Sequence, residues 1–202
     1  MSWRVKNERP EEDYAGDAKR YYAEQWTNYS KNNAVRTTQR KLTLRAAELL
    51  MAPPGTKVLD AGCGNGFSME VLQELGYKVK GFDASRELTA EAVKTGFSVR
   101  QGDFTRMPYA DKTFDYAFSI SALQWVLAKP DAERRIAKTA REFKRVLRKE
   151  GRAVLQFYPK SEEALNEAGR AFRQAGFKVT IITDNPDNAI KRRVFLLLAL
   201  EK

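Results

Sequence analysis

The sequence predicts an α/β fold: a seven-stranded, mostly parallel sheet with an antiparallel last strand and helices on both faces. Short apolar segments alternate with amphipathic helical patterns along most of the chain, which is typical of doubly wound sheets whose strands are buried on both faces. A glycine-rich turn joins the first apolar segment to a helical one. The last two strand segments are too close in sequence for a helical crossover, so they are expected to pair as an antiparallel hairpin.

The 202 residues suit one domain with a short appendage. Residues 1–50 are expected to form an arm, loose to about Pro10, and two helices that cover the active site. Residues 51–202 are expected to form the catalytic domain. The strands are expected at Lys57–Ala61, Lys78–Asp83, Phe97–Arg100, Asp115–Ser119, Arg152–Tyr158, Lys178–Thr183 and Arg193–Leu200. The helices are expected at Asp17–Tyr29, Thr38–Met51, Ser68–Gly76, Ser85–Thr95, Asp131–Glu150 and Glu162–Ala175.

Composition narrows the possible environments and partners. The net charge is +10, and residues 129–202 carry 18 Lys or Arg against 10 Asp or Glu, which favours a polyanionic partner. The single cysteine, Cys63, cannot form an internal disulfide, so a reducing compartment, the cytoplasm, is expected. We expect no membrane association, because no apolar run is long enough for a span. No Cys/His pattern predicts a metal site.

A glycine-rich loop follows the first strand. It carries Asp60, Gly62, Cys63, Gly64 and Gly66. Glycines let the backbone approach a ligand without Cβ clashes, but the G-x-G-x-G spacing differs from the G-x-G-x-x-G of dinucleotide-binding turns. S-adenosylmethionine fits better, because it has no phosphate and ends in an ammonium and a carboxylate. We expect Asp60 on the ammonium side, with Gly62, Cys63 and Gly64 near the carboxylate and ribose.

Two further acids follow at the ends of strands. Asp83, followed by Ala84, can accept hydrogen bonds from both ribose hydroxyls. Asp103 can accept one from the adenine amino group while Phe104 packs near the base plane. A lone acid at a strand end is usually a helix N-cap, but this ordered series predicts a Rossmann-like, class I S-adenosylmethionine-dependent methyltransferase.

The acceptor is expected to lie beside the segment after the fourth strand. The candidates there are Ser119, which would also border the cofactor, Ser121, Gln124 and Trp125. An adenine-N6 motif of the N-P-P-Y type is absent from this segment, and the chain has no histidine, the commonest general base. These absences favour guanine N7, which needs positioning and stacking rather than proton removal. Trp125 and Tyr158 could supply that stacking, although such aromatics more often pack in a core.

The 119–125 segment, together with 152–159, resembles the bud-site-selection methyltransferases, called Williams–Beuren syndrome methyltransferase in humans. The resemblance runs from about Tyr14 to Leu200 and includes the strings S-I-S-A-L-Q-W and R-A-V-L-Q-F-Y-P. It implies an rRNA guanine-N7 methyltransferase that modifies small-subunit ribosomal RNA in ribosome biogenesis. The sequence ends at Lys202 without the basic tail of eukaryotic members, and on this resemblance an archaeal-like member is expected.

The resemblance also implies two partners. One is a small zinc-binding activator protein, expected to extend the sheet at the edge strand Phe97–Arg100, beside apolar Ala92 and Val93. The other is small-subunit ribosomal RNA, whose phosphates Lys191, Arg192 and Arg193 are expected to contact.

Two alternative functions remain open at the level of sequence. The chain could be a methyltransferase of transfer RNA or of a small molecule. It could also be a ribosome-assembly factor whose binding role outweighs catalysis.

Overall fold

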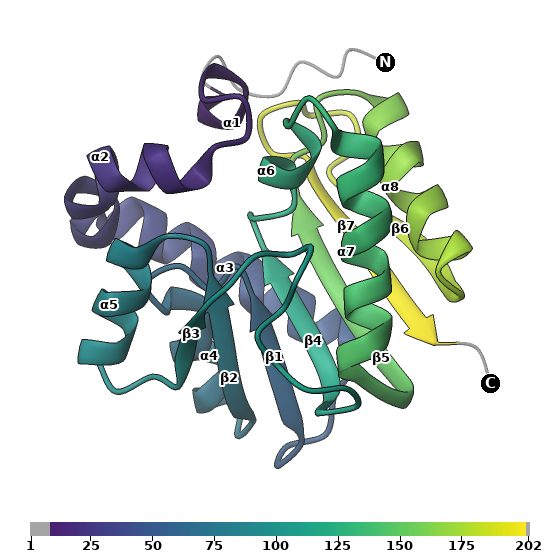
Figure 1. Ribbon diagram of the computed structural model, residues 1–202, viewed down its shortest axis with the longest axis horizontal. Coiled ribbons are helices and arrows are strands. Elements are labelled where there is room, and N and C mark those ends of the chain that lie inside the picture. Colours follow the sequence, from purple (N-terminus) through teal and green to yellow (C-terminus); the bar gives the residue numbers. More distant parts are fainter. Residues whose placement is uncertain (1–8, 201–202) are drawn as a thin grey trace.

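Seven strands form one sheet in the order β3-β2-β1-β4-β5-β7-β6 in the computed structural model, which describes residues 9–200 (Figure 1). The strands are β1 Lys57–Ala61, β2 Lys78–Asp83, β3 Val99–Gln101, β4 Phe114–Ile120, β5 Leu147–Phe157, β6 Phe177–Asp184 and β7 Arg193–Leu200. Neighbours from β3 to β5 pair parallel, whereas β7 runs antiparallel to both β5 and β6. The predicted mixed sheet with its antiparallel last strand is therefore confirmed.

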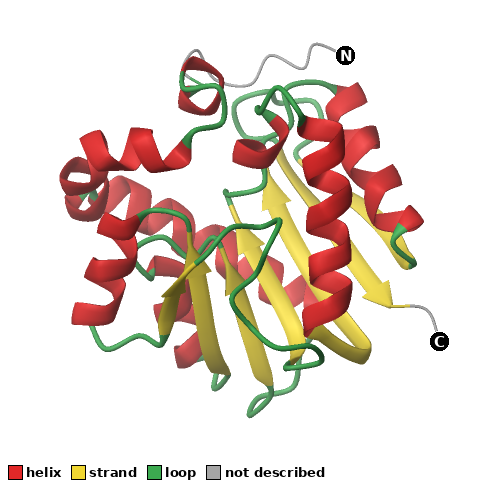
Figure 2. Ribbon diagram, viewed as in Figure 1, coloured by secondary structure: helices red, strands yellow, loops and turns green. Residues whose placement is uncertain are grey.

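Helices cover both faces of the sheet (Figure 2). They are α1 Pro10–Asp13, α2 Ala18–Lys31, α3 Asn33–Leu50, α4 Phe67–Glu74, α5 Arg86–Lys94, α6 Gln124–Leu127, α7 Ala132–Val146 and α8 Glu162–Gln174. The apolar stripes of α7 and α8 join one core cluster with Phe143 and Phe172, and those of α3 and α4 join a second cluster on the opposite face. None of the helices in the described residues has the length and apolar character needed to cross a membrane.

Several predicted boundaries were wrong for identifiable reasons. The helix expected to run to Glu150 ends at Val146, because Leu147 adopts extended backbone angles and pairs with Phe114 in the sheet. Strong helix formers in 147–150 are thus overridden by tertiary pairing. The helix expected from Thr38 begins at Asn33, because the Asn32 side chain accepts hydrogen bonds from two backbone amides of the first turn and caps it.

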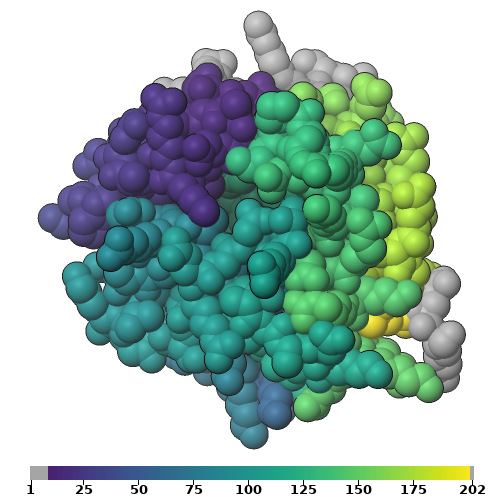
Figure 3. Space-filling model, in the orientation of Figure 1, coloured from purple at the N-terminus to yellow at the C-terminus, as the bar shows by residue number. Residues whose placement is uncertain are grey.

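The N-terminal segment lies over the carboxyl ends of the central strands (Figure 1). Figure 3 shows it, in purple, packed against the teal and green parts of the chain. Arg9 links it to the sheet, because Nη2 of Arg9 donates a hydrogen bond to the carbonyl of Tyr158, just past β5, at 3.0 Å. Most of the arm predicted up to Pro10 lies outside the described residues, as does Lys202. This arrangement encloses the end of the sheet where the functional residues meet.

Candidate functional site

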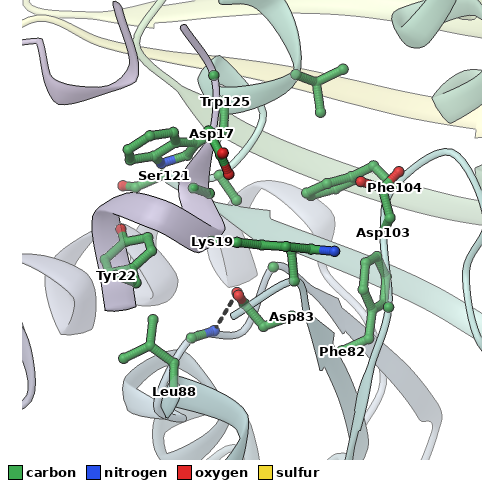
Figure 4. A pocket seen from close by; sticks show the side chains of 18 of the residues that line it. Asp17, Lys19, Tyr22, Phe82, Asp83, Leu88, Asp103, Phe104, Ser121 and Trp125 are labelled. Carbon is green, nitrogen blue, oxygen red and sulfur yellow. Dashed lines mark hydrogen bonds between the residues drawn. The ribbon is translucent and has the colours of Figure 1, made fainter. Parts of the chain in front are cut away.

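The strand order reverses at β1, which pairs with β2 on one side and β4 on the other. Ligands of open α/β sheets bind in the crevice beyond the carboxyl ends at such a point. A cavity of about 320 Å³ lies there (Figure 4). Eight predicted site residues line it: Gly62, Gly64, Asp83, Ala84, Asp103, Phe104, Ser121 and Trp125. We refer to it as the first cavity.

The glycine loop forms the floor of the first cavity. The amides of Gly62 and Cys63 both donate to the carbonyl of Phe82, at 2.9 and 3.0 Å, which ties the loop to β2. Gly62 has φ +77°, and a Cβ there would stand 2.5 Å from the Cβ of Ala122. Only glycine fits such an approach. Cys63 is buried and does not line the cavity, and burial raises the pKa of its thiol.

Asp83 presents a carboxylate to the first cavity. One oxygen accepts a hydrogen bond from the amide of Gly64 at 2.9 Å (dashed in Figure 4), and the other accepts one from the amide of Ser85 at 2.9 Å. Burial raises the pKa of Asp83. Each carboxylate oxygen can accept more than one hydrogen bond, so this group fits a ligand with two neighbouring hydroxyls.

Asp60 lies behind the glycine loop and does not line the first cavity. It is fully buried, and Oδ2 accepts a hydrogen bond from the hydroxyl of Ser68. Its other oxygen, Oδ1, has no hydrogen-bond partner, and burial raises the pKa of Asp60 to about 7. An unpartnered buried carboxylate oxygen costs free energy, so its presence fits a cationic group of a ligand, reached directly or through water.

Asp103 and Phe104 stand on the opposite side of the first cavity from Tyr22 (Figure 4). Asp103 Oδ1 accepts hydrogen bonds from the amide and hydroxyl of Thr105 at 2.8 and 2.6 Å. The ring of Phe104 meets that of Phe82 edge to face, with centroids 5.4 Å apart. This side therefore combines a carboxylate with an aromatic surface, as the adenine prediction requires.

Sequence reasoning expected the N-terminal helices to cover the active site but did not name the side chains that they bring to the first cavity. Lys19, Tyr22 and Tyr29 of α2 line it, and Lys19 extends across it toward the side of Asp103 and Phe104 (Figure 4). The available signal was the seven-residue spacing of Tyr22 and Tyr29, which puts both rings on one face of a helix.

A second cavity, of about 350 Å³, adjoins the first. The two share Tyr22, Tyr29, Ser121 and Trp125. Gln124 and Tyr158 also line the second cavity, so four of the five predicted acceptor residues come together there. The fifth, Ser119, is fully buried in β4 with an unpartnered hydroxyl and lines neither cavity.

Hydrogen bonds fix Ser121 in the wall that the two cavities share. This residue has φ +55°, a strained conformation for a non-glycine residue. Its amide and hydroxyl both donate to Oε1 of Gln156, at 3.1 and 2.9 Å. Tyr158 packs under the guanidinium of Arg193, which lies 5.7 Å from the ring centroid, and burial raises the pKa of its hydroxyl.

The predicted RNA-binding residues differ in their surroundings. Arg192 is buried, and its guanidinium donates to the carbonyl of Pro186 from Nε and Nη2, at 3.0 and 2.7 Å, so it holds the loop between β6 and β7. Lys191 and Arg193 instead line a groove of about 420 Å³ with Lys41 and Arg45 of α3. Nη1 of Arg193 donates to the carbonyls of Ile190 and Arg192 at 2.9 and 2.7 Å, but Arg193 is only half-buried and lines the groove. Lys191 and Arg193, but not the buried Arg192, therefore remain candidate phosphate contacts.

The predicted partner strand does lie at an edge of the sheet. It is shorter than expected, Val99–Gln101, and the ring of Phe97 packs instead against the glycine loop, beside Gly66. The flanking surface is smaller than predicted, since Ala92 is fully buried while Val93 is 54 % exposed.

The fold and cavities define a methyltransferase domain of class I. A family model described as "Methyltransferase domain" matches residues 59–155, from the end of β1 to β5. The cofactor of this class is S-adenosylmethionine, which confirms the prediction from the glycine loop.

Proteins of similar sequence show which family of methyltransferases the chain belongs to. The chain is 32 % identical to the 18S rRNA (guanine-N(7))-methyltransferase of Mus musculus, over 96 % of this chain and 72 % of that protein. It is 31 % identical to the 18S rRNA (guanine-N(7))-methyltransferase of Schizosaccharomyces pombe, over 84 % of this chain and 66 % of that one. The chain belongs to this 18S rRNA (guanine-N(7))-methyltransferase family, and the predicted resemblance is confirmed. It is also 33 % identical to the 18S rRNA (guanine(1575)-N(7))-methyltransferase of Saccharomyces cerevisiae, over 79 % of this chain. The chain spans less than two thirds of the Schizosaccharomyces pombe and Saccharomyces cerevisiae relatives, 66 and 61 % of their lengths.

A solved structure shows the same fold. It is a complex between the Haloferax volcanii Trm112 methyltransferase activator and a methyltransferase, and the similar chain has a TM-score of 0.62, 17 % identity, and coverage of 96 % of this chain and 98 % of that one.

Proposed function

We propose that this chain transfers a methyl group from S-adenosylmethionine to N7 of a guanosine in small-subunit ribosomal RNA during ribosome biogenesis. The observation that carries the proposal is the pair of adjoining cavities that share Ser121 and Trp125. The first contains the carboxylates and glycine backbone suited to the cofactor. The second is walled by aromatic rings suited to a base. The names of the relatives support guanine N7 as the acceptor.

The residues that line the first cavity, together with Asp60 behind its floor, fit the cofactor group by group. Oδ1 of Asp60, which has no partner, would accept from the ammonium, directly or through water. Asp83 would accept hydrogen bonds from the ribose hydroxyls, and Asp103 with Phe104 would hold the adenine. When bound, the cofactor supplies an electrophilic methyl group on a sulfonium.

Catalysis would rest on positioning. Guanine N7 carries an in-plane lone pair, so no proton is removed before attack, and the chain contains no histidine. N7 would take the methyl group that the sulfonium supplies, with the electron pair of the broken S–CH₃ bond left on sulfur. Tyr158 and Trp125, whose rings line the second cavity, would stack on the base and hold it in line. The buried acids near the cofactor are fixed before the reaction, which lowers the cost of reorganisation.

The RNA would approach along the basic groove. Lys41, Lys191 and Arg193 line that groove, and Thr38 borders both the groove and the second cavity. Backbone phosphates next to the target guanosine would therefore be held by cations while the base enters the second cavity.

A small zinc-binding activator protein would pair with β3. The carbonyl of Ser98 and the amide of Gly102 bond to β2, so by the alternation of a strand the backbone groups of Val99 and Gln101 point to the free edge. Gln101→Pro removes an outward amide donor and should abolish co-purification with the activator. Gln101→Ala keeps that amide and should co-purify normally. Equal co-purification of both variants would exclude this edge as the interface.

The test of the reaction is transfer of labelled methyl to purified small subunits and to bulk transfer RNA, with and without the activator. Borohydride–aniline cleavage then maps any N7-methylguanosine. We expect one activator-dependent cleavage in small-subunit RNA. Label in transfer RNA, or label in the subunit without a cleavable product, would refute the guanine-N7 assignment.

A further inference from the structure

Gln124 contributes a buried acceptor with no partner to the second cavity. The residue is 8 % exposed, and its Nε2 donates to the carbonyl of Ser121 at 2.8 Å, which fixes the side-chain amide. Its Oε1 has no hydrogen-bond partner. Buried polar atoms are nearly always hydrogen-bonded, so an orphaned acceptor in the wall of a cavity indicates a ligand that brings a donor.

Glu11 contributes a second buried acceptor to the same cavity. It is 6 % exposed, which is rare for a glutamate, and burial raises the pKa of its carboxyl. Oε1 forms an ion pair with Nη2 of Arg9 at 2.8 Å, and the same nitrogen donates to the carbonyl of Tyr158. Arg9 therefore fixes Glu11 and α1 against the end of β5.

Aromatic rings complete the second cavity. The ring of Trp125 packs against those of Tyr21 and Tyr22, with centroids 5.3 and 5.7 Å apart, and Tyr158 lines the cavity from just past the end of β5. These rings offer flat surfaces against which a planar aromatic ligand can stack, in the same cavity that Glu11 and Gln124 line.

We propose that Glu11 and Gln124 recognise the N1–H and 2-amino donors of guanine and so select the base that is methylated. This inference rests on the proposed function. Guanine presents a ring N–H and an amino group side by side, a pattern that suits two acceptors, whereas adenine presents an acceptor at N1. Recognition through this edge leaves N7, on the other ring of the purine, free for methyl transfer.

The test measures binding of GMP, IMP and AMP to the full chain with its activator and S-adenosylhomocysteine, by calorimetry. IMP lacks only the 2-amino group, and AMP lacks both donors. A hydrogen bond to a charged acceptor corresponds to about 10- to 100-fold in affinity. We expect the affinity of the wild-type protein to fall in the order GMP, IMP, AMP. Glu11→Gln should weaken GMP binding at least ~10-fold and leave the affinity for AMP unchanged.

Glu12→Gln is the matched control. Glu12 lies on the same helix and also pairs with Arg9, at 3.0 Å, but it does not line the second cavity, so the variant should keep wild-type selectivity. Gln124→Met provides a second variant, expected to narrow the GMP-to-AMP ratio. That ratio is taken within one preparation, so partial misfolding lowers both affinities equally and leaves it unchanged.

Two outcomes would overturn the inference. The first is a wild-type protein that binds GMP, IMP and AMP equally or binds none of them, and the second is a Glu11→Gln variant whose selectivity for GMP is as high as that of the wild type. Methyl transfer to small subunits is measured separately for each variant. Label in transfer RNA together with intact GMP selectivity would refute the proposed substrate alone. Normal transfer to small subunits without GMP selectivity would refute the recognition pair alone.

Discussion

Replacing Gly62 by alanine tests whether the glycine loop requires close backbone approach. At φ +77° an L-residue is strained by about 1–2 kcal/mol. The new Cβ would also stand 2.5 Å from Cβ of Ala122 and 3.2 Å from the ring of Phe104. Ala122 cannot rotate away, so the backbone must shift, at a cost typical of overpacking, about 1–3 kcal/mol. We expect a free energy of unfolding lower by about 2–5 kcal/mol in total, measured in urea.

Gly55→Ala is the control that separates the cost of the positive φ from the cost of the close contacts of a new Cβ. Gly55 has a similar φ, +83°, but a Cβ there meets nothing within 4 Å, so only the strain of about 1–2 kcal/mol applies. The shift at Gly62 displaces the floor of the first cavity and should weaken S-adenosylhomocysteine binding at least ~10-fold by calorimetry, whereas Gly55→Ala should bind normally. Equal destabilisation by the two variants, with unchanged binding in both, would refute the reasoning.

Three further predictions concern charged side chains. Burial raises the pKa of Asp60 from 3.8 to about 7, so the protonated carboxyl stabilises the fold below about pH 4, and this contribution is lost as the pH rises through 7. The free energy of unfolding, measured by urea titration, should therefore fall between these pH values, and Asp60→Asn should remove up to ~4 kcal/mol of that fall. Asp83→Asn should weaken S-adenosylhomocysteine binding ~10- to 100-fold by calorimetry, with unchanged small-subunit affinity in filter binding. Lys191→Ala should weaken small-subunit binding and flatten its salt dependence, whereas Arg192→Ala should instead lower stability by about 1–2 kcal/mol.

The cofactor half of the site could be predicted from sequence because each of its parts is local. The glycine loop, Asp83 and Asp103 each lie at the carboxyl end of a strand or within two residues of it, and parallel strands bring their carboxyl ends to one edge of the sheet. Spacing along the chain therefore predicts proximity in space. The same logic placed Ser121 and Trp125 after β4, where both now line the shared wall.

Other features depend on tertiary context that spacing does not encode. The helices α1 and α6 have four residues each, too few for a periodic pattern. Arg192 lies in a run of three basic residues, a composition typical of solvent-exposed segments. The loop turns, however, so that its guanidinium donates to the carbonyl of Pro186. Side chains alternate between the two faces of the sheet, and Ser119, one residue before the end of β4, is fully buried on one of them.

The acceptor half of the site is assembled from remote segments, and this has a functional consequence. Glu11 comes from α1, Gln124 from α6 and Tyr158 from the end of β5, and Arg9 joins the first and last of these. The cofactor half needs none of those three side chains. Substitutions at Glu11, which does not line the first cavity, should therefore change base selectivity and leave S-adenosylhomocysteine affinity the same, and substitutions at Asp83 should do the reverse.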